Sequence, residues 1–182
     1  MLRLFVGLEL PESFHTEFSM IQSGLPNARW VAPENLHLTL QFIGEIDEDV
    51  AEDIDAALKA VEHSAFDLSL AGMGCFESRN RARAVWLDVA PEPKLGHLHA
   101  KIEQALIHAG LPPSGRKFKP HVTLARLKRT PVDAVSFYLE AHGAIRLPAF
   151  TVDHVTLFRS HLSHSGANYE KLADYTLSPV GQ

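Results

Sequence analysis

Two stretches of the sequence, His37-Leu38-Thr39-Leu40 and His121-Val122-Thr123-Leu124, repeat one pattern of four residues. Each lies in a run of alternating residues, 36–43 and 121–127, of the kind that predicts a β-strand. Successive side chains of a strand point to opposite faces, so the histidine and the threonine of each stretch share one face. The residues between them are apolar and turn toward a core. Two strands are therefore predicted, each presenting an imidazole beside a hydroxyl.

The elements predicted around these two strands also occur twice. Each half of the chain reads as strand, helix, strand, helix, strand, and one more strand is predicted over 169–180. The predicted elements span 2–10, 14–21, 36–43, 47–61 and 66–76 in the first half, and 84–90, 95–106, 121–127, 131–143 and 150–159 in the second. Pro11 and Pro91, which follow the two leading strands, lie 80 residues apart, and the two central strands lie about 84 apart. One long offset predicts a single domain, 1–182, built from a duplicated βαβαβ unit with halves of about 1–80 and 81–182.

The composition is that of an ordinary globular protein, with 46% hydrophobic and 21% charged residues among 182. Cys75 is the only cysteine, which excludes an intrachain disulfide and a thiolate metal cluster. The apolar run at residues 1–10 is too short and too interrupted for a signal peptide or a membrane span. We therefore expect a cytoplasmic protein.

The formal net charge of −5 argues against a protein that coats nucleic acid, because such a protein needs a broadly basic surface. The basic residues nevertheless gather in two segments. These contain Arg79, Arg81 and Arg83, and Arg116, Lys117, Lys119, Arg126, Lys128 and Arg129. Both segments can be solvated loops, or they can form a rim that collects an anion at a local site. The sequence leaves both interpretations open.

The chemistry of the two patterned strands follows from their residue types. If a pseudo-twofold axis relates the two halves, His37 and His121 face each other across a cleft together with Thr39 and Thr123. Histidine has an ordinary pKa of about 6.5, so near neutral pH one imidazole can accept a proton while the other donates one. In-line displacement at phosphorus needs both transfers, on opposite sides of the phosphorus atom. The threonine hydroxyls can donate hydrogen bonds to the non-bridging oxygens. This set of groups needs no metal ion and no cofactor.

A single His-x-Thr on a strand is common by chance, and one copy would carry little weight. Two copies at matching places of a repeated architecture favour a functional role, because core packing does not require a histidine on both strands. A non-catalytic nucleotide-binding module remains an alternative. It is disfavoured because binding alone does not require two titratable imidazoles.

The two stretches resemble the twin His-x-Thr-x motifs of the 2H phosphoesterase superfamily. The surrounding residues are most similar to one branch, the RNA 2′,3′-cyclic phosphodiesterases of the 2′–5′ RNA ligase family. The matching segments are Arg3–Gly7, Asn35–Gly44, Arg83–Leu87 and Phe118–Arg126, and Tyr169 and the closing strand also fit. The resemblance implies a bilobal α+β fold, with two antiparallel sheets flanking a central cleft and helices outside. One departure is Tyr175, where the family pattern has a tryptophan.

The same resemblance implies an activity and roles for the two histidines. The family opens a terminal 2′,3′-cyclic phosphate to a 2′-phosphomonoester without a metal. Carried over, His37 is the proton donor to the leaving 3′-oxygen and His121 is the proton acceptor that activates water. The implied partners are RNA or oligonucleotides with a cyclic phosphate end and small nucleotides, bound by a monomer that does not engage membranes. The reverse reaction, 2′–5′ joining of RNA, is expected as a minor activity.

Three more residues are candidates for the site. Arg126 and Phe42 each follow a motif histidine by five positions, where strict alternation turns the side chain toward the core. We expect Phe42 to be buried there, and to be a base-binding residue if it faces the cleft instead. An arginine is not expected on an apolar face, so we predict a β-bulge or a strand end that re-aims Arg126 toward a phosphate. Tyr169 is a further candidate for binding a base.

The remaining histidines give no metal site. His97 and His99 are two residues apart on a predicted helix and so lie on different faces. His154, His161 and His164 lie at a strand end and in a serine-rich loop, where solvated side chains are expected.

Overall fold

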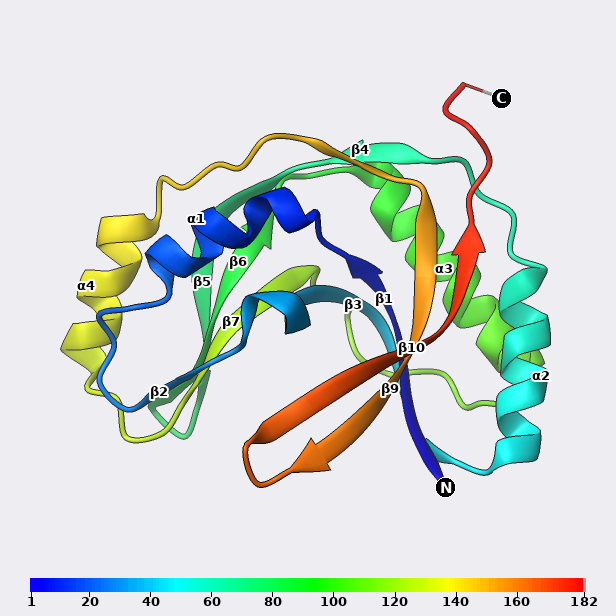
Figure 1. The fold of residues 1–182 in the computed structure, drawn as a ribbon, viewed down its shortest axis with the longest axis horizontal. Helices are drawn as coiled ribbons and strands as arrows, with labels where there is room; N and C mark the ends of the chain where they lie inside the picture. Colours follow the sequence, from blue (N-terminus) through cyan, green and yellow to red (C-terminus); the bar gives the residue numbers. More distant parts are fainter. Residues whose placement is uncertain (182) are drawn as a thin grey trace.

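The computed structural model describes residues 1–181, which form two four-stranded antiparallel sheets and one small two-stranded sheet (Figure 1). The first sheet has the order β10 (Gly166–Thr176), β9 (His154–Ser163), β1 (Leu2–Glu9), β3 (His37–Ile46). The second has the order β2 (Ala28–Trp30), β7 (His121–Leu127), β6 (Arg81–Val89), β5 (Leu70–Ser78). The third pairs β4 (Phe66–Leu68) with β8 (Phe150–Val152). The predicted α+β class with two antiparallel sheets is confirmed.

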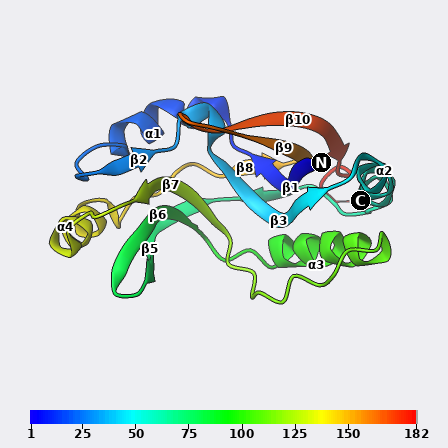
Figure 2. The same ribbon diagram turned by 90° about the horizontal axis from the view of Figure 1, so that it is seen from below.

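Two pairs of helices cover the outer faces of the sheets. In Figure 1, α2 (Glu48–Lys59) and α3 (Pro93–His108) lie together at one end, and α1 (His15–Ile21) and α4 (Val132–His142) lie at the other. The short 3₁₀ turns η1 (Glu12–Phe14) and η2 (Pro33–Asn35) precede α1 and β3. A hydrogen bond from the Tyr138 hydroxyl to the Ile21 carbonyl joins α4 to α1. Figure 2 shows the two main sheets as separate layers, with β3 and β7 in the middle of the molecule.

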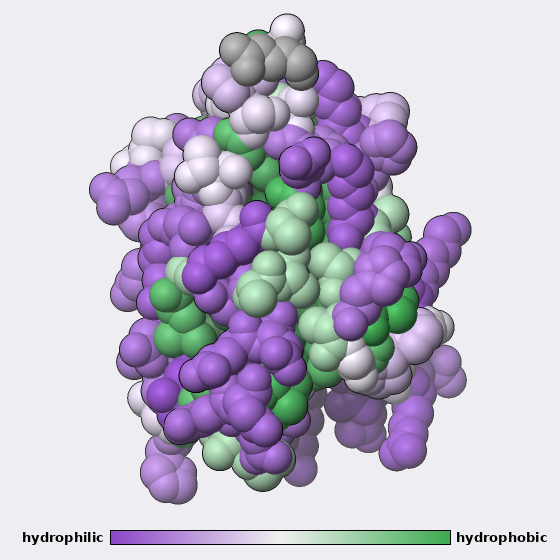
Figure 3. Space-filling model, turned by 90° about the vertical axis from the view of Figure 1, so that its right-hand side faces the viewer, coloured by the Kyte–Doolittle hydropathy of each residue, from purple (hydrophilic) through white to green (hydrophobic). Residues whose placement is uncertain are grey.

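The hydrophobic core is continuous and lies between the sheets and their helices. Alternate residues of the central strands point into it, among them Leu4, Val6 and Leu8 of β1, Leu38 and Leu40 of β3, Val85 and Leu87 of β6, and Val122 and Leu124 of β7. Each helix contributes its apolar stripe, for example Ile54 and Leu58 of α2. The outer side of α2 and α3 is mostly hydrophilic, with a narrow apolar stripe between the helices (Figure 3) that includes Ala57, Val61 and Ala105.

The two repeats of the sequence exchange the strands β5 and β9, so that each of these strands joins the sheet of the other half. The element pairs β3 and β7, α2 and α4, β4 and β8, and β5 and β9 each begin 84 residues apart. β1 pairs with β3 of its own half and with β9 of the second half, while β6 pairs with β7 of its own half and with β5 of the first half. Neither sheet is therefore made from one half of the chain alone.

Several element boundaries differ from those predicted. The strand predicted over 66–76 is broken at Ser69 into β4 and β5, and the strand predicted over 150–159 is broken at Asp153 into β8 and β9. In each case the two pieces belong to different sheets. β3 continues through Gly44, which adopts a φ of +93° that favours glycine, and ends at Ile46. The short strand β2 was not predicted, because three residues carry no periodic signal.

Both motif strands contain a β-bulge three residues after the histidine. On β3, Gln41 pairs with Val6 and Thr39 pairs with Gly7, which leaves Leu40 between them without a partner in the register. On β7, Ala125 pairs with Val85 and Thr123 pairs with Trp86, which leaves Leu124 in the same position. A bulge inserts one extra residue and so reverses the alternation of every side chain beyond it. Gln41 and Phe42 of β3, and the residues of β7 after Leu124, therefore face the side opposite to that predicted. On β3 a second irregularity skips Ile43, because Phe42 pairs with Phe5 and Gly44 pairs with Leu4, and it restores the original alternation, so that Ile46 is again buried.

Within residues 1–181, no helix combines the length and the hydropathy that crossing a bilayer requires.

Candidate active site

His37, Thr39, His121 and Thr123 line one cavity of about 430 Å³ between the two main sheets. The histidine and the threonine of each motif lie on the same face of their strand, and the apolar residues between them are buried in the core. The structure thus brings together the four residues that the sequence placed on facing strands. Other residues of the cavity include Arg3, Phe5, Asn35, Phe42, Arg116, Arg126, Ser160 and Tyr169.

A backbone carbonyl two residues upstream fixes each imidazole. His37 Nδ1 lies 2.8 Å from the Asn35 oxygen, and His121 Nδ1 lies 2.7 Å from the Lys119 oxygen. A carbonyl can only accept, so Nδ1 carries the proton in both rings and donates it to the carbonyl. This leaves Nε2 of each ring for chemistry in the cavity. The Nε2 of His37 lies 3.0 Å from Thr39 Oγ1.

Aromatic rings hold both imidazoles in place, and some of them come from the exchanged strands. Phe158 on β9 lies 6.0 Å from His37 between ring centroids, and Phe76 on β5 lies 4.8 Å from His121 in an edge-to-face arrangement. Each motif histidine therefore contacts a phenylalanine from the other half of the chain. Phe5 and Trp86, from the central strands of the two sheets, also pack beside His37 and His121 respectively.

The indole of Trp86 requires a glycine beneath it. A Cβ built on Gly74 would lie 2.2 Å from the Trp86 ring, so any larger residue there would displace the indole. Because Trp86 is buried beside His121, this glycine on the neighbouring strand helps to set the position of that imidazole.

The electrostatic environment of His37 favours its neutral form. Desolvation by burial is the largest cause and lowers the pKa of His37 below its ordinary value, and the positive charges of His121 and Arg126 lower it further. The hydrogen bond to the Asn35 carbonyl opposes these effects without cancelling them. In the ligand-free protein His37 therefore loses its proton more readily than an exposed histidine.

The bulges decide where Phe42 and Arg126 lie. Arg126 is exposed and lines the cavity with His121 and Thr123, and the predicted bulge that re-aims it is present at Leu124. The prediction that Phe42 is buried in the core is wrong. Phe42 is 53% exposed and lines the cavity, and the Arg3 guanidinium lies 5.2 Å from its ring centroid. The bulge at Leu40 reverses the alternation there, which single-strand periodicity cannot anticipate.

Tyr169, on the β9–β10 hairpin, packs edge-on against the imidazole of His37 at 4.8 Å and against Phe5 at 5.1 Å. It therefore forms a wall of the cavity beside His37. Tyr175 lies elsewhere: it is buried, and its hydroxyl donates to Asp55 of α2 at 2.8 Å.

Sequence reasoning missed several residues of the site. Asn35 and Lys119 act through their backbone carbonyls, and the sequence does not reveal this role because every residue type has such a carbonyl. Both nevertheless lie in the segments that carry the family resemblance. Arg3, Phe5 and Trp86 lie in those segments too. Phe76 and Phe158 give no local signal, since only the strand exchange brings them to the histidines.

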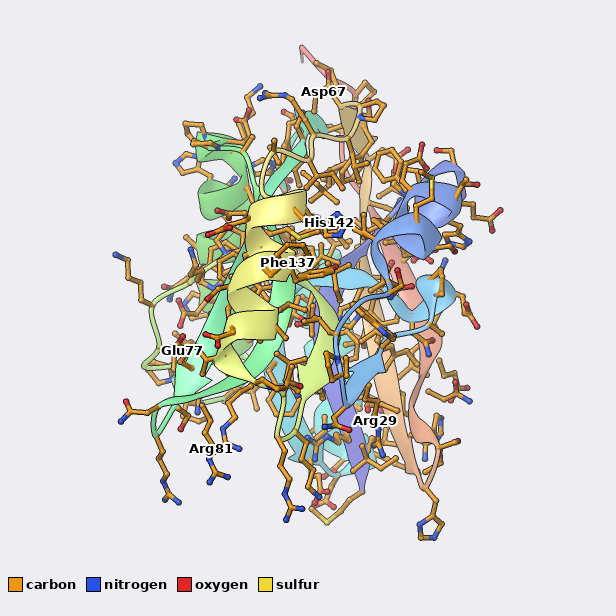
Figure 4. All side chains as sticks on the ribbon, turned by 90° about the vertical axis from the view of Figure 1, so that its left-hand side faces the viewer. Arg29, Asp67, Glu77, Arg81, Phe137 and His142 are labelled. Carbon is orange, nitrogen blue, oxygen red and sulfur yellow. The ribbon has the colours of Figure 1, made fainter. Side chains whose placement is uncertain are left out.

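The two basic segments have different positions. Arg79, Arg81 and Arg83 are exposed at the end of the β5–β6 hairpin, and Arg81 points outward there (Figure 4), as expected of solvated side chains. In contrast, Arg116 and Arg126 line the cavity. For these two residues of the second segment the interpretation as an anion-collecting rim fits better, whereas Lys128 and Arg129 lie at a different pocket, beside Arg29.

Among residues 1–181, one group of side chains is close enough together to be considered as a metal site. It consists of Glu9, His154 and Asp174, whose potential ligand atoms all lie within 4.8 Å of one another. The ammonium of Lys171 already lies 2.9 Å from Glu9 and 3.1 Å from Asp174, and His154 Nε2 lies 2.9 Å from Glu9. These carboxylates thus balance cations of the chain itself. Of the other histidines, His161 pairs with Glu170, and His99 stacks on Phe118.

Two antiparallel sheets that flank a cleft and direct one His-x-Thr pair each into it define the class of two-histidine (2H) phosphoesterases. A sequence model described as the 2′-5′ RNA ligase superfamily matches residues 10–164, and the chain belongs to this family.

Curated relatives carry the name RNA 2′,3′-cyclic phosphodiesterase. The relative from Aeropyrum pernix is 32% identical over 90% of this chain and 94% of its own length, and the one from Archaeoglobus fulgidus is 34% identical over 70% and 74%. Among solved structures, Escherichia coli LigT in its apo form has a TM-score of 0.79 at 26% identity, covering 97% of this chain and 98% of that one. Thermus thermophilus TT0787 has the same TM-score and identity, covering 98% and 100%.

Proposed function

We propose that this protein hydrolyses the 2′,3′-cyclic phosphate at an RNA end to a 2′-phosphomonoester, with His37 and His121 as an acid–base pair and no metal ion. One observation carries the proposal: two imidazoles, each with Nδ1 held by a carbonyl, line one cavity with two threonines and an arginine. The names of the relatives support the same activity. Crystals of LigT with NADP⁺ support a nucleotide as the kind of molecule that fits this fold.

The reaction requires one proton to be taken and one to be given. His121 Nε2 removes a proton from water while the water oxygen forms a bond to phosphorus. The bond from phosphorus to the 3′-oxygen breaks, and His37 Nε2 gives its proton to that oxygen. The product keeps the phosphate on the 2′-oxygen. The two histidines have then exchanged protonation states, and exchange with solvent restores them.

The remaining polar groups stabilise the charge that develops on phosphorus. Thr39 and Thr123 donate to the non-bridging oxygens from the two sides of the cavity, and the Arg126 guanidinium pairs with the same oxygens. The bound anion also changes His37. It offsets the positive charges that lower the pKa of His37, and so favours the protonated imidazole that the reaction requires.

The terminal nucleoside lies against the aromatic and basic residues of the cavity. Tyr169 and Phe42 offer apolar ring surface for the base or ribose on the His37 side. The reverse reaction, in which a 5′-hydroxyl takes the place of water, uses the same two histidines and gives a 2′–5′ bond. It is a minor activity because water is always present at far higher concentration.

The decisive experiment is incubation with a 2′,3′-cyclic mononucleotide in the presence of EDTA, followed by identification of the product isomer by ³¹P NMR. The 2′-phosphate is expected. Formation of the 3′-phosphate would show that the 2′-oxygen, and not the 3′-oxygen, is the leaving group. Binding of the nucleotide without any turnover would instead indicate a non-catalytic nucleotide-binding module. Loss of activity in EDTA, with recovery when a divalent metal is added, would refute the metal-free mechanism.

We also propose that the chain works as a monomer and a single domain in the cytoplasm. The continuous core and the exchanged strands support one cooperative unit, because neither half can complete a sheet alone. One unfolding transition in calorimetry and a monomer mass in sedimentation are expected.

A further inference from the structure

A second cavity, of about 680 Å³, adjoins the active-site cavity. The two share Thr39, Phe42, Arg116 and His121, so they form one continuous space. From His121 the second cavity follows residues 39–43 of β3 and reaches the 111–119 segment. This segment returns from α3 to β7 (Figure 2). We call this second cavity the side groove. A water molecule takes up only about 30 Å³ in the liquid, so the side groove is far larger than the nucleophile needs.

The charge of the side groove is positive although the chain as a whole is acidic. Arg116, Lys117 and Lys119 line it. Within residues 1–181 none of these three side chains forms a salt bridge with a carboxylate. One acidic residue, Glu103, lies in the same groove, and its carboxylate accepts a hydrogen bond from the Ser114 backbone amide at 3.1 Å. The groove therefore attracts an anion.

Aromatic rings line the same groove. Phe118 stacks face to face on His99, with centroids 4.0 Å apart and an interplanar angle of 1°. Phe76 and Phe42 add partly exposed rings at the end nearest to the catalytic residues. Cationic side chains along a groove with interspersed aromatic rings are typical of sites for single-stranded nucleic acid, where cations follow the phosphates and rings stack with bases.

We propose that the side groove binds the nucleotides that precede the cyclic end of a single-stranded RNA. This inference rests on the proposed function, which places the terminal nucleotide in the active-site cavity. An RNA chain attached to that nucleotide has to leave the cavity, and the side groove is continuous with it at Thr39 and His121. The preferred substrate is therefore an oligoribonucleotide rather than a free cyclic nucleotide.

The test compares kcat/KM for a cyclic mononucleotide with that for a tetranucleotide ending in the same cyclic nucleotide. The tetranucleotide should be favoured by about tenfold, the effect of one base stacked on an aromatic ring. Its kcat/KM should also fall more steeply with salt, by about 0.7 in logarithmic slope for each added phosphate contact. Equal values for both substrates would overturn the side groove proposal while leaving the hydrolytic function intact. Hydrolysis of neither would instead refute the function.

Two variants connect the preference to the groove. Lys117→Glu should lower the ratio of the two kcat/KM values several-fold, whereas Lys94→Glu, the same change at an exposed position of α3 away from the groove, should not. Phe118→Leu keeps an apolar side chain but removes the ring, and should lower the ratio as well. A ratio unchanged in both groove variants would place the RNA elsewhere.

An alternative occupant of the side groove is a second RNA strand that carries a 5′-hydroxyl. Such a strand would be recognised by the same cations and rings, and a competition experiment distinguishes it from the nucleotides that precede the cyclic end. If the side groove holds such a strand, an added oligonucleotide without a cyclic phosphate should yield joined product, and the tetranucleotide should have no advantage. That result would overturn the proposal. Inhibition by the added strand that is stronger for the tetranucleotide than for the mononucleotide would support it.

Discussion

Phe42 and Arg126 occupy equivalent positions, each five residues after a motif histidine, and both face the active-site cavity because a bulge interrupts each motif strand. The repeat thus places an aromatic ring on one side of the cavity and a guanidinium on the other. This difference makes two otherwise matching motifs unequal, with the cation on the side of His121.

Arg126→Ala should weaken binding of inorganic phosphate and of cyclic nucleotides by about 10- to 100-fold, the range for a lost hydrogen bond to a charged group. Arg126→Lys should recover only part of this, because lysine lacks the planar fork that pairs with two oxygens. Calorimetric titration measures the effect, and Arg81→Ala, at an outward-pointing arginine (Figure 4), is the control. Equal binding in the wild type and Arg126→Ala would remove Arg126 from the site.

His37→Ala and His121→Ala should each lower turnover of a cyclic nucleotide by at least about 100-fold, the lower range for a general acid or base. Both proteins should remain folded, since the side chains lie at the cavity. A substrate with a nitrophenol leaving group needs no proton, so it should rescue His37→Ala far more than His121→Ala. The opposite rescue would exchange the two roles. His108→Ala, at an exposed position of α3, serves as the control.

Thr39→Val and Thr123→Val should each lower kcat by on the order of 10- to 100-fold, with little change in the midpoint of urea unfolding. Each change removes a donor and keeps the shape of the side chain. Thr176→Val, at an exposed position of β10, should leave kcat unaltered. If neither motif variant is slower, the hydroxyls do not contact the reacting phosphate.

The pKa of His37 should lie below the ordinary histidine value of about 6.5 in the free protein. Replacing Arg126 by alanine should raise it, because one of the positive charges that lower it is removed. Adding inorganic phosphate should raise it as well. Titration of the histidine signals by NMR measures all three values, and a pKa at or above 6.5 in the free protein contradicts the environment described for this residue.

His154 should stabilise the folded protein at low pH and lose this effect as the pH rises, because its pKa is raised in the folded state. Burial alone would lower its pKa, but hydrogen bonds to the carboxylates of Asp153 and Glu9 outweigh burial and raise it. A raised pKa in the folded state means that the folded protein holds this proton more tightly than the unfolded chain. The stabilisation is fully present below about pH 6.5 and is lost as pH rises through the folded value. The difference in unfolding free energy between wild type and His154→Gln should shrink over that window, and a constant difference would show that His154 does not titrate there.

Much of the fold and the centre of the site follows from local sequence. Alternation over 36–43 and 121–127 is enough to place His37 with Thr39, and His121 with Thr123, on one face of each strand, because side-chain direction in a strand is set by neighbouring residues. The duplicated order of elements likewise predicts one domain with two similar halves, while the α+β class with antiparallel sheets followed from the family resemblance of the motif segments.

The tertiary structure decided what depends on register and on contacts between distant segments. The bulges at Leu40 and Leu124 turned Phe42 and Arg126 toward the cavity, and pairing with β1 and β6, not local propensity, creates them. The exchange of β5 and β9 brought Phe76 to His121 and Phe158 to His37. The lowered pKa of His37 follows from burial among such neighbours. The residues of the motifs thus determine which groups can act, while long-range strand pairing determines how each group is oriented, packed and charged.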